Sequence, residues 1–212
     1  MTHPWWPLHQ MRLHSADLVL APLTEVDLAD VVAVLPADVE LNPGAFRFAV
    51  DEQTHRGVVA HQEYWRYYGT WTPSSWRLKF AVRRNGALIG LQELEGEDFP
   101  TLRTVDTSSW LVPDARGTGV GKRMRRAVLA LAFGPLGALA AVTSAWQDNE
   151  SSLGVSRSIG YRPNGESFLA RGDDVDTLVH LRMTRADWEA TGAAAEVTVE
   201  GFGPCRPYFG LS

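Results

Sequence analysis

The chain has 212 residues, of which 45% are hydrophobic and 21% are charged, a composition that suits one globular domain with a sizeable core. Its formal net charge of -5 disfavours nucleic-acid binding through bulk electrostatics. No apolar run reaches the roughly 20 residues that a membrane span needs, and residues 1–10 lack the pattern of a signal peptide. Cys205 is the only cysteine, so we expect no disulfide within the chain and a cytoplasmic location. We therefore expect neither nucleic acid nor membrane as a partner.

The first third of the chain predicts a strand followed by two helices. Residues 17–23 are expected to form the strand. Residues 24–35 predict a helix, because Thr24 and Asp27 form a capping-box start and apolar residues then recur at helical spacing. Asn42-Pro43-Gly44 breaks the chain, and residues 58–68 predict a second helix. The aromatic residues of this region are expected mainly to pack on a sheet, with the lining of a substrate groove as the alternative. They are Tyr64, Trp65, Tyr67, Tyr68 and Trp71.

From Trp76 the hydrophobic pattern changes to strict alternation, which predicts an antiparallel hairpin. Residues 76–83 and 87–94 form its two strands, and Asn85-Gly86 between them is a strong turn signal. Alternation on the second strand places Glu93 on the face of Ile89 and Leu91. The remaining expected elements are a strand at 102–112, a helix at 122–133, a strand at 138–146, a helix at 149–159 ended by Gly160, strands at 168–171 and 175–183, a short helix begun by Thr184 and Asp187, and a strand at 196–200.

A glycine-rich loop, Arg116-Gly117-Thr118-Gly119-Val120-Gly121-Lys122, joins the strand at 102–112 to the next helix. Alternate glycines let the backbone approach a ligand closely, and the unpaired N–H groups of a helix N-terminus attract phosphate. A Walker A loop is excluded because Arg116 and Arg123 replace its first glycine and its hydroxyl residue. A dinucleotide fingerprint is excluded because Lys122 replaces its last glycine. The loop therefore indicates a pyrophosphate site flanked by two cations, with a flexible turn as the alternative.

Two motifs in order then point to one family. Ser109-Trp110-Leu111-Val112-Pro113 precedes the loop, and the loop reads Arg-x-x-Gly-x-Gly. Asn149-Glu150-Ser151-Ser152, Val155 and Ile159-Gly160-Tyr161 follow. Residues 105–161 thus resemble the GNAT superfamily of N-acetyltransferases. They resemble most the branch of bacterial ribosomal-protein N-terminal alanine and serine acetyltransferases, although Ser109 stands where that branch commonly has an aromatic residue.

The resemblance implies a mixed α/β fold, with a splayed, mostly antiparallel central sheet and helices on both faces. It implies one acetyltransferase domain over residues 1–212, with a core at about 17–188 and an added tail at 192–212. Acetyl-CoA would bind where two parallel strands part, with its pantetheine arm on the backbone of Leu111 and Val112. Asn149 would start its helix and bind the pantetheine, while Ser152 would donate to the sulfur, with helix capping as the alternative for Ser152. The pyrophosphate would bind to Arg116, Gly117, Thr118, Gly119, Val120, Gly121 and Lys122.

The implied reaction is direct attack of a primary amine on acetyl-CoA in a ternary complex, the amine being a protein N-terminus or a small molecule. The first candidate for the proton acceptor is Glu93, which its strand face directs into a cleft, and the second is Asp106. Glu95 and Asp98 are expected to be solvated charges at a loop. Thr104 leaves the family's usual carboxylate position empty, so a water chain is a further alternative.

Other chemistries have less support. The histidines show no metal-ligand spacing, so we expect no metal, and no Gly-x-Ser-x-Gly elbow is present. Cys205, expected in a flexible tail, is not expected to be a nucleophile. The main rival hypothesis is a non-catalytic acyl-CoA-binding regulatory protein, and the second is a general nucleotide-binding module. The sequence does not identify the acceptor amine, and it is compatible with a homodimer.

Overall fold

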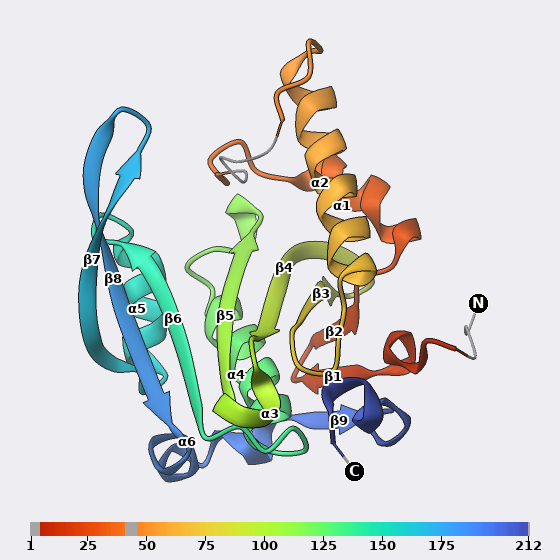
Figure 1. Ribbon diagram of the computed structural model, residues 1–212, viewed down its shortest axis with the longest axis vertical. Helices are drawn as coiled ribbons and strands as arrows, with labels where there is room; N and C mark the ends of the chain where they lie inside the picture. Colours follow the sequence, from red (N-terminus) through yellow and green to blue (C-terminus); the bar gives the residue numbers. More distant parts are fainter. Residues whose placement is uncertain (1–4, 41–45, 212) are drawn as a thin grey trace.

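The computed structural model describes residues 5–40 and 46–211. In this part of the chain nine strands form one sheet in the order β7-β8-β6-β5-β4-β3-β2-β1-β9 (Figure 1). The break expected at Asn42-Pro43-Gly44 lies outside the described residues. The strands are β1 (Arg12–Ser15), β2 (Leu18–Pro22), β3 (Trp76–Arg84), β4 (Ala87–Gly96), β5 (Thr104–Leu111), β6 (Ala140–Trp146), β7 (Arg162–Arg171), β8 (Asp174–Thr184) and β9 (Thr198–Glu200). The helices are α1 (Leu28–Val34), α2 (Glu52–Gly69), α3 (Phe99–Leu102), α4 (Val120–Phe133), α5 (Glu150–Ser158) and α6 (Arg185–Thr191).

The sheet is splayed between β5 and β6, the parallel pair among the described strands. These two strands pair only from Thr104 opposite Ala140 to Asp106 opposite Val142. Beyond that point β5 continues beside β4, and β6 continues beside β8. We call the gap between residues 107–111 of β5 and residues 143–146 of β6 the wedge. The expected fold, a splayed and mostly antiparallel sheet with helices on both faces, is therefore confirmed.

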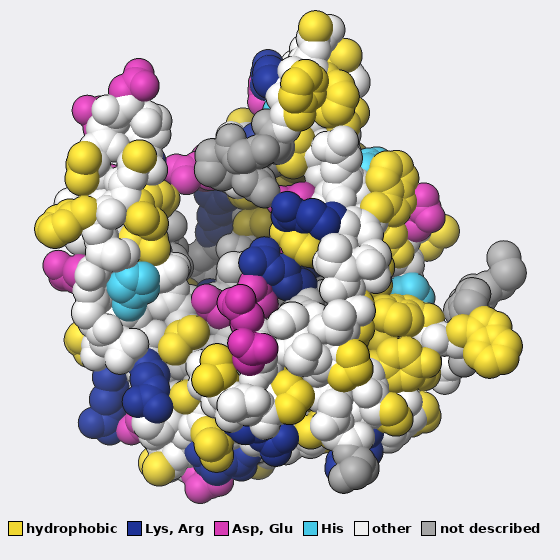
Figure 2. All heavy atoms as spheres, viewed as in Figure 1, with side chains coloured by type: hydrophobic (Ala, Val, Ile, Leu, Met, Phe, Trp, Pro, Cys, Tyr) yellow, Lys and Arg dark blue, Asp and Glu magenta, His cyan; other side chains and the backbone are white. Residues whose placement is uncertain are grey.

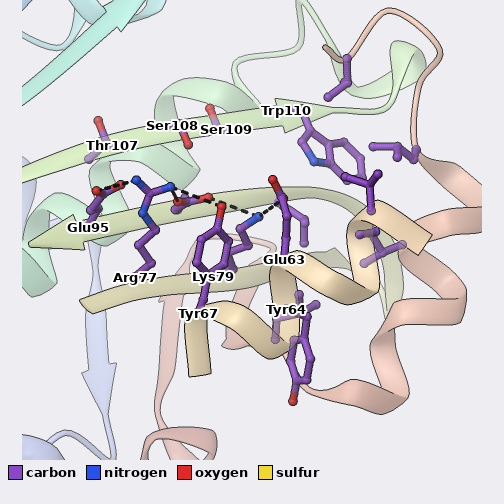
Figure 3. A pocket seen from close by; sticks show the side chains of 18 of the residues that line it. Glu63, Tyr64, Tyr67, Arg77, Lys79, Glu95, Thr107, Ser108, Ser109 and Trp110 are labelled. Carbon is purple, nitrogen blue, oxygen red and sulfur yellow. Dashed lines mark hydrogen bonds and ion pairs between the residues drawn. The ribbon is translucent and has the colours of Figure 1, made fainter. Parts of the chain in front are cut away.

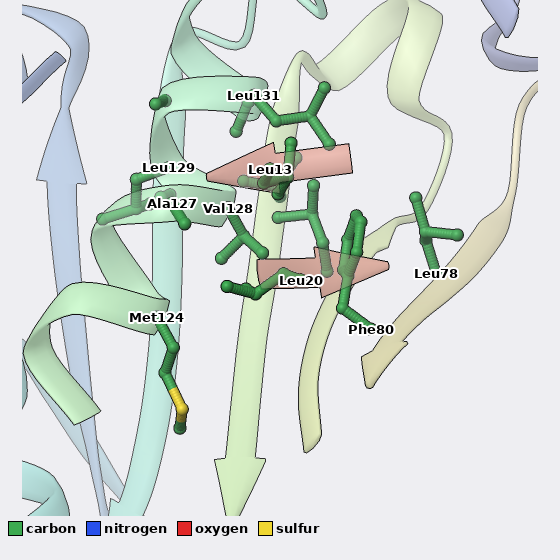
Figure 4. Packing of buried hydrophobic residues seen from close by; sticks show 14 of the residues in the cluster. Leu13, Leu20, Leu78, Phe80, Met124, Ala127, Val128, Leu129 and Leu131 are labelled. Atoms are coloured by element: carbon green, nitrogen blue, oxygen red, sulfur yellow. The ribbon is translucent and has the colours of Figure 1, made fainter. Parts of the chain in front are cut away.

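Helices cover the two faces of the sheet unequally. On one face α4 and α5 pack together, and α4 lies across β1, β2, β4 and β5. On the other face α1 packs Leu28 and Val31 against Ala81 and Leu91. Figure 4 shows the larger core around α4, whose apolar side meets alternate residues of the first three strands. The labelled members are Leu13, Leu20, Leu78, Phe80, Met124, Ala127, Val128, Leu129 and Leu131.

Both terminal segments, which the sequence placed outside the core, contribute side chains to this larger cluster. Leu8 and Leu13 near the start are fully buried, and so are Cys205 and Phe209 near the end. The expected strand at 196–200 forms as β9 and pairs with β1. The expectation of a flexible tail around Cys205 is wrong, because residues 203–209 coil into a 3-10 turn whose apolar side chains fill a gap beside Trp76. Strand β1 was missed because Leu13 is its single apolar residue.

Local signals in the sequence are confirmed at several turns and caps. Asn85 and Gly86 both have positive φ and form the two-residue turn between β3 and β4. Thr24 and Thr184 each start a helical segment with a capping box. Gly160 has a φ of 109° directly after α5, as expected for a glycine that ends a helix.

A β-bulge in β4 changes which side chains share a face. The pairing with β3 shifts by one residue between Val82 and Arg83, so Ile89 is an extra residue on β4. Ile89 therefore belongs to the core around α4, whereas Leu91 belongs to the cluster on the opposite face. The expectation that Glu93 shares a face with Ile89 is wrong for this reason, although Glu93 and Leu91 do share one.

Candidate active site

The glycine loop wraps into the N-terminus of α4 beside the wedge. Gly117 and Gly119 have φ values of 72° and 80°, a conformation that other residues adopt at a cost. No side chain of the described residues caps α4, since the Thr118 hydroxyl donates instead to the Ala115 carbonyl at 2.7 Å. The first N–H groups of this 14-residue helix are thus left for water or an anion.

Gly121 has no structural need to be glycine. It is the second residue of α4 and does not have a positive φ. A Cβ placed there would lie 3.6 Å from Val155 of α5 and 3.8 Å from Leu111 of β5, which are ordinary contacts. The missing side chain leaves space where α4, α5 and the end of β5 meet, at the wedge. This is the space that a ligand approaching the backbone of the loop would require.

The end of β5 directs backbone groups into the wedge. The Val112 N–H donates to the Ile89 carbonyl at 3.0 Å, so this N–H is already paired with β4, and the predicted role of Val112 towards the pantetheine stays a prediction. Because hydrogen-bonding directions alternate along an antiparallel strand, Ser109 and Leu111 direct their backbone groups to the other side. No described strand pairs with that side beyond Asp106, but the Thr107 carbonyl accepts from the Thr143 hydroxyl at 2.8 Å and the Leu111 carbonyl accepts from the Arg116 Nε at 3.0 Å. The expected role of Leu111 towards the pantetheine stays a prediction.

Asn149 and Ser152 lie at the start of α5. The Asn149 Oδ1 accepts from the Ser152 N–H at 3.0 Å, so the predicted helix-starting role of Asn149 is confirmed. Ser152 is partly buried, and its carbonyl accepts from the Ser156 hydroxyl at 3.0 Å. A role for either side chain towards a ligand stays a prediction.

The connection after α1 crosses to both sides of the wedge. Asp38 accepts from both terminal nitrogens of Arg116, at 2.5 and 2.9 Å, and these hydrogen bonds hold the pKa of the Asp38 carboxyl below its usual value. Glu40 accepts from Arg171 at 2.8 Å and from the Trp146 indole at 3.2 Å. The guanidinium expected to bind pyrophosphate is therefore paired with a carboxylate in this structure.

A hollow of about 440 Å³ lies on the face of the sheet that α1 and α2 cover. Figure 2 shows it between the β7–β8 hairpin and α2, with acidic and basic side chains gathered inside. Its apolar wall includes Leu28, Leu91 and Trp110. We call it the carboxylate cleft after its charged lining residues, which include Glu63, Arg77, Lys79, Glu93, Glu95 and Asp106.

Ion pairs join most of these charges across neighbouring strands (Figure 3). Glu93, with 15% of its side chain exposed, lies 3.6 Å from the Lys79 ammonium and 3.7 Å from the Arg77 guanidinium. Lys79 also donates to Glu63 at 3.0 Å, and Arg77 to Glu95 at 2.8 Å. Desolvation would lower the pKa of Lys79, but attraction to Glu93 and Glu63 outweighs it and the net shift is upward. Both cations therefore stay charged near neutral pH.

Glu95 is not the solvated loop charge that the sequence suggested. It lies within β4, and burial raises the pKa of its carboxyl despite the attraction of Arg77. Asp98 is exposed at a turn, as expected.

Asp106 differs from the other carboxylates because no cation of the described residues lies within 4.0 Å of it. Its Oδ1 accepts from the Thr107 N–H at 2.6 Å, and its side chain lines the carboxylate cleft. It reaches solvent, yet partial desolvation by the cleft walls raises the pKa of the carboxyl, and the charge of Glu93 adds to the rise. Asp106 is also the last β5 residue that pairs with β6, so it lies at the apex of the wedge.

A comparison with known protein families identifies the family of the chain. A model described as acetyltransferase (GNAT) domain matches residues 17–162, more than half of the chain. The chain belongs to the GNAT acetyltransferase family. GNAT acetyltransferases use acetyl-CoA as co-substrate, and the free N–H groups of α4, the open side of Gly121 and the backbone of the wedge fit that ligand. Residues 5–40 and 46–211 hold no cluster of three or more side chains suited to a metal ion, and none of their helices is long and apolar enough to cross a membrane.

Solved GNAT structures share the fold at low sequence identity. A chimera of the spermidine N-acetyltransferase SpeG of Vibrio cholerae and hSSAT is 13% identical, with a TM-score of 0.64 over 82% of this chain and 99% of the chimera. A T. thermophilus protein assigned as an acetyltransferase is 18% identical, with a TM-score of 0.67 over 87% of this chain and 93% of that protein. A Vibrio cholerae protein assigned as a ribosomal-protein-serine acetyltransferase is 13% identical, with a TM-score of 0.63 over 82% of this chain and 97% of that protein. These similarities support the fold and leave the acceptor open.

Several residues at the site were not singled out from the sequence. Arg77 and Lys79 are polar positions of the alternating strand expected at 76–83, and Glu63 lies in the helix expected at 58–68; none of them was given a role. Arg125, in the helix expected at 122–133, was given no role either, yet it is only 3% exposed. The sequence did show charged residues alternating on the two strands of the hairpin. Which of these charges face one another depends on the register of β3 and β4, and this register depends on the bulge at Ile89.

Proposed function

We propose that this protein is an N-acetyltransferase that transfers the acetyl group of acetyl-CoA to a primary amine by direct attack in a ternary complex. The observation that carries the proposal is the position of β5. Its end, with Leu111, meets the open side of Gly121, while the opposite face of the same strand presents Asp106 to an acidic cleft. One short strand thus separates a space suited to a diphosphate ligand from a space suited to a cationic amine.

We propose that the α4 N-terminus and its loop bind the pyrophosphate through backbone N–H groups, with Lys122 as an accompanying cation. Arg116 would join them only after it leaves Asp38. Ser109 and the Leu111 N–H would pair with the pantetheine amides, since unsatisfied strand groups need partners when water is displaced. The Leu111 carbonyl would join them only after Arg116 leaves it. Asn149 and Ser152 would lie beside the sulfur at the start of α5.

The reaction requires the protein to position the amine and the thioester and to supply a proton acceptor. The amine nitrogen bonds to the acetyl carbon, the carbon–sulfur bond breaks with its electrons left on sulfur, and one amine proton leaves. Glu93 was the first candidate to take that proton, but it already has two cationic partners. Asp106 has the stronger case, because it forms no ion pair with the described residues and lies at the apex of the wedge. It would accept the proton directly or through water.

The charge of the cleft favours a positively charged acceptor before deprotonation. Among its charged lining residues, carboxylates outnumber cations. A protein N-terminus, as acetylated by the ribosomal-protein branch that the motifs resemble, meets this condition. So does a polyamine such as the spermidine of the neighbouring structures. We further infer that the chain acts as one acetyltransferase domain, since terminal side chains such as Leu8 and Phe209 share its core.

The proposal is tested in two steps. Thermal unfolding is first followed with acetyl-CoA, ATP and NAD, since a true ligand stabilises by mass action, by about 2.7 kcal/mol at a concentration 100-fold above Kd. Release of CoA is then measured with peptides bearing N-terminal alanine or serine, spermidine and simple primary amines. Stabilisation by acetyl-CoA alone together with amine-dependent CoA release supports the enzyme. Stabilisation without release for any amine supports the regulatory protein, and stabilisation by ATP or NAD instead supports a general nucleotide-binding module.

A further inference from the structure

A buried arginine lies beneath the wedge without a carboxylate partner. Arg125 of α4 is 3% exposed, and no acidic group of the described residues lies within 4.0 Å of its guanidinium. Charged side chains are almost never fully buried unless they are paired, because an unpaired buried charge is costly. A charge kept in the interior without such a partner indicates a specific role for the side chain, either structural or in ligand binding.

The contacts of Arg125 are hydroxyl groups: three lie on elements that meet at the wedge, and a fourth is that of Tyr161. Its Nη2 lies 3.3 Å from the Ser109 Oγ of β5, and its Nη1 lies 3.3 Å from the Thr143 Oγ1 of β6 and 3.4 Å from the Ser156 Oγ of α5. Its Nε has no partner among the described residues. Both Ser109 and Thr143 lie just beyond the last paired residues of β5 and β6. The guanidinium therefore lies where the two strands have separated.

The hydroxyl groups are oriented to accept from the arginine. The Thr143 hydroxyl donates its proton to the Thr107 carbonyl at 2.8 Å, and the Ser156 hydroxyl donates to the Ser152 carbonyl at 3.0 Å. Each thus has lone pairs free for Arg125. Aligned hydrogen bonds of this kind polarise one another in a low dielectric. They hold the guanidinium in place without neutralising it.

The titratable groups around Arg125 leave its positive charge in place. Desolvation lowers the pKa of Arg125, and attraction to Tyr161 and to Asp106 opposes that shift. A guanidinium stays protonated near neutral pH even so. Burial raises the pKa of Tyr161, so the phenol is neutral there. Asp106 acts from beyond ion-pair distance.

We propose that Arg125 is a positioning residue for the sulfur side of the reaction: through the Ser109 hydroxyl and its unneutralised charge, it stabilises the thiolate that leaves when the carbon–sulfur bond breaks. This rests on the proposed function, because acetyl-CoA must bind in the wedge. The inference extends the proposed function, because it assigns the CoA thiolate, the negatively charged product, to a site inside the fold. The amine proton goes to the carboxylate side of β5, and the electron pair of the broken bond stays on sulfur, on the side of Arg125.

A structural brace between β5, β6 and α5 is the competing explanation, and Arg125→Met separates the two. Methionine approximates the volume without the charge. Replacing a buried charge with a well-packed apolar residue is often neutral or stabilising. The brace predicts a lower Tm and weaker binding of acetyl-CoA. The proposal predicts an unchanged or higher Tm, an acetyl-CoA Kd within about twofold of the original, and a selective loss of affinity for the thiolate of CoA.

The measurement is calorimetric binding of CoA, acetyl-CoA and desulfo-CoA, which lacks the thiol, between about pH 6 and pH 9. A free thiol has a pKa near 8.5, and a nearby cation lowers the pKa of an acidic group by about one unit or more. The unaltered protein should therefore prefer CoA over desulfo-CoA increasingly as pH rises, by up to about tenfold per pH unit below the free-thiol pKa. In Arg125→Met the pKa of the bound thiol should return towards that of the free thiol, so the rise in preference with pH should shrink or disappear. Arg125→Lys should restore part of it because it keeps the charge.

Ser109→Ala serves as the second variant, since it leaves Arg125 in place and removes the hydroxyl between it and the wedge. This variant should reduce the pH-dependent preference for CoA over desulfo-CoA without changing Tm. An unchanged preference for CoA over desulfo-CoA in Arg125→Met, or no such preference in the unaltered protein, would overturn the inference, while acetyl-CoA binding together with amine-dependent release of CoA would uphold the proposed function. Failure of the unaltered protein to bind any of the three ligands would overturn both.

Discussion

A carboxylate introduced at position 121 should abolish acetyl-CoA binding while the chain still folds. Gly121 has helical backbone geometry, and a Cβ there would make only ordinary contacts with Val155 and Leu111. Replacing a helical glycine is worth roughly 0.5–1 kcal/mol, and a carboxylate in the first turn adds about 0.3–1 kcal/mol through the helix dipole. At about 2–4 °C per kcal/mol for a chain of this size, Tm should stay unchanged or rise by a few degrees.

The effect on binding is set by charge. Two unit charges about 4 Å apart repel by about 4 kcal/mol at an effective dielectric constant near 20. This corresponds to a loss of about 10³-fold in affinity. Lys122 and Arg116 on the same loop offset part of the repulsion, and the second charge of the diphosphate adds to it, so about 10³-fold is an order of magnitude. Gly119→Glu is a less direct probe, because its φ of 80° adds backbone strain of about 1–2 kcal/mol.

The assay is calorimetric titration of acetyl-CoA into Gly121→Glu, Gly121→Gln and Gly121→Ala, with Tm recorded for each. Glutamine has nearly the shape of glutamate without its charge, so the difference between these two variants isolates the electrostatic part. The alanine variant reports the loss of close backbone approach alone. A folded Gly121→Glu variant that binds acetyl-CoA with the original Kd would refute both the loop assignment and the reasoning from the empty Cβ position.

Four further predictions test separate parts of the site and fold. Ser152→Ala should lower kcat with little change in the Kd of acetyl-CoA if its hydroxyl donates to the departing sulfur; a lower Tm with normal kcat would support capping instead. Asp106→Asn should remove the acidic limb of the pH–rate profile, because desolvation raises the pKa of this carboxyl and only the ionised form accepts a proton. If the acidic limb persists in Asp106→Asn and disappears in Glu93→Gln, Glu93 is the proton acceptor. Cys205 should resist alkylation at about pH 8, since burial raises its pKa to about 11, and rapid labelling of the folded protein would contradict this. Phe209→Ala should lower Tm by roughly 6–20 °C, because removing a buried phenylalanine costs about 3–5 kcal/mol; a shift under about 2 °C would show that the tail is dispensable.

Features set by local chemistry could be predicted from the sequence. The turn at Asn85-Gly86 requires positive φ at both positions, and few residue pairs provide it. The capping boxes at Thr24 and Thr184 each need two residues three apart. Two of the loop glycines were recognisable for the same reason, since Gly117 and Gly119 have positive φ.

The carboxylate cleft could not be predicted because it depends on register. A regular two-residue hairpin would place Lys79 opposite Gln92. The extra residue Ile89 instead places Lys79 opposite Glu93 and Arg77 opposite Glu95. A bulge of one residue has no reliable sequence signal here, although Gly90 marks the place: a Cβ there would lie 2.3 Å from the Trp110 carbonyl. Arg125 was missed because its burial comes from elements distant in sequence, β5, β6 and α5.

The pairing of β6 with β8 limits how far the chain can be shortened. The segment that the GNAT family model matches ends at residue 162, before β8 begins at Asp174. A chain trimmed to residues 17–162 would leave β6 with a bare edge from Ala140 to Trp146, next to a wedge that already lacks pairing on its other side. A strand exposed along both edges is a template for association with other chains. Such a fragment should therefore aggregate, and trials of expression or of domain fusion should keep β8 and the segment that carries Phe209.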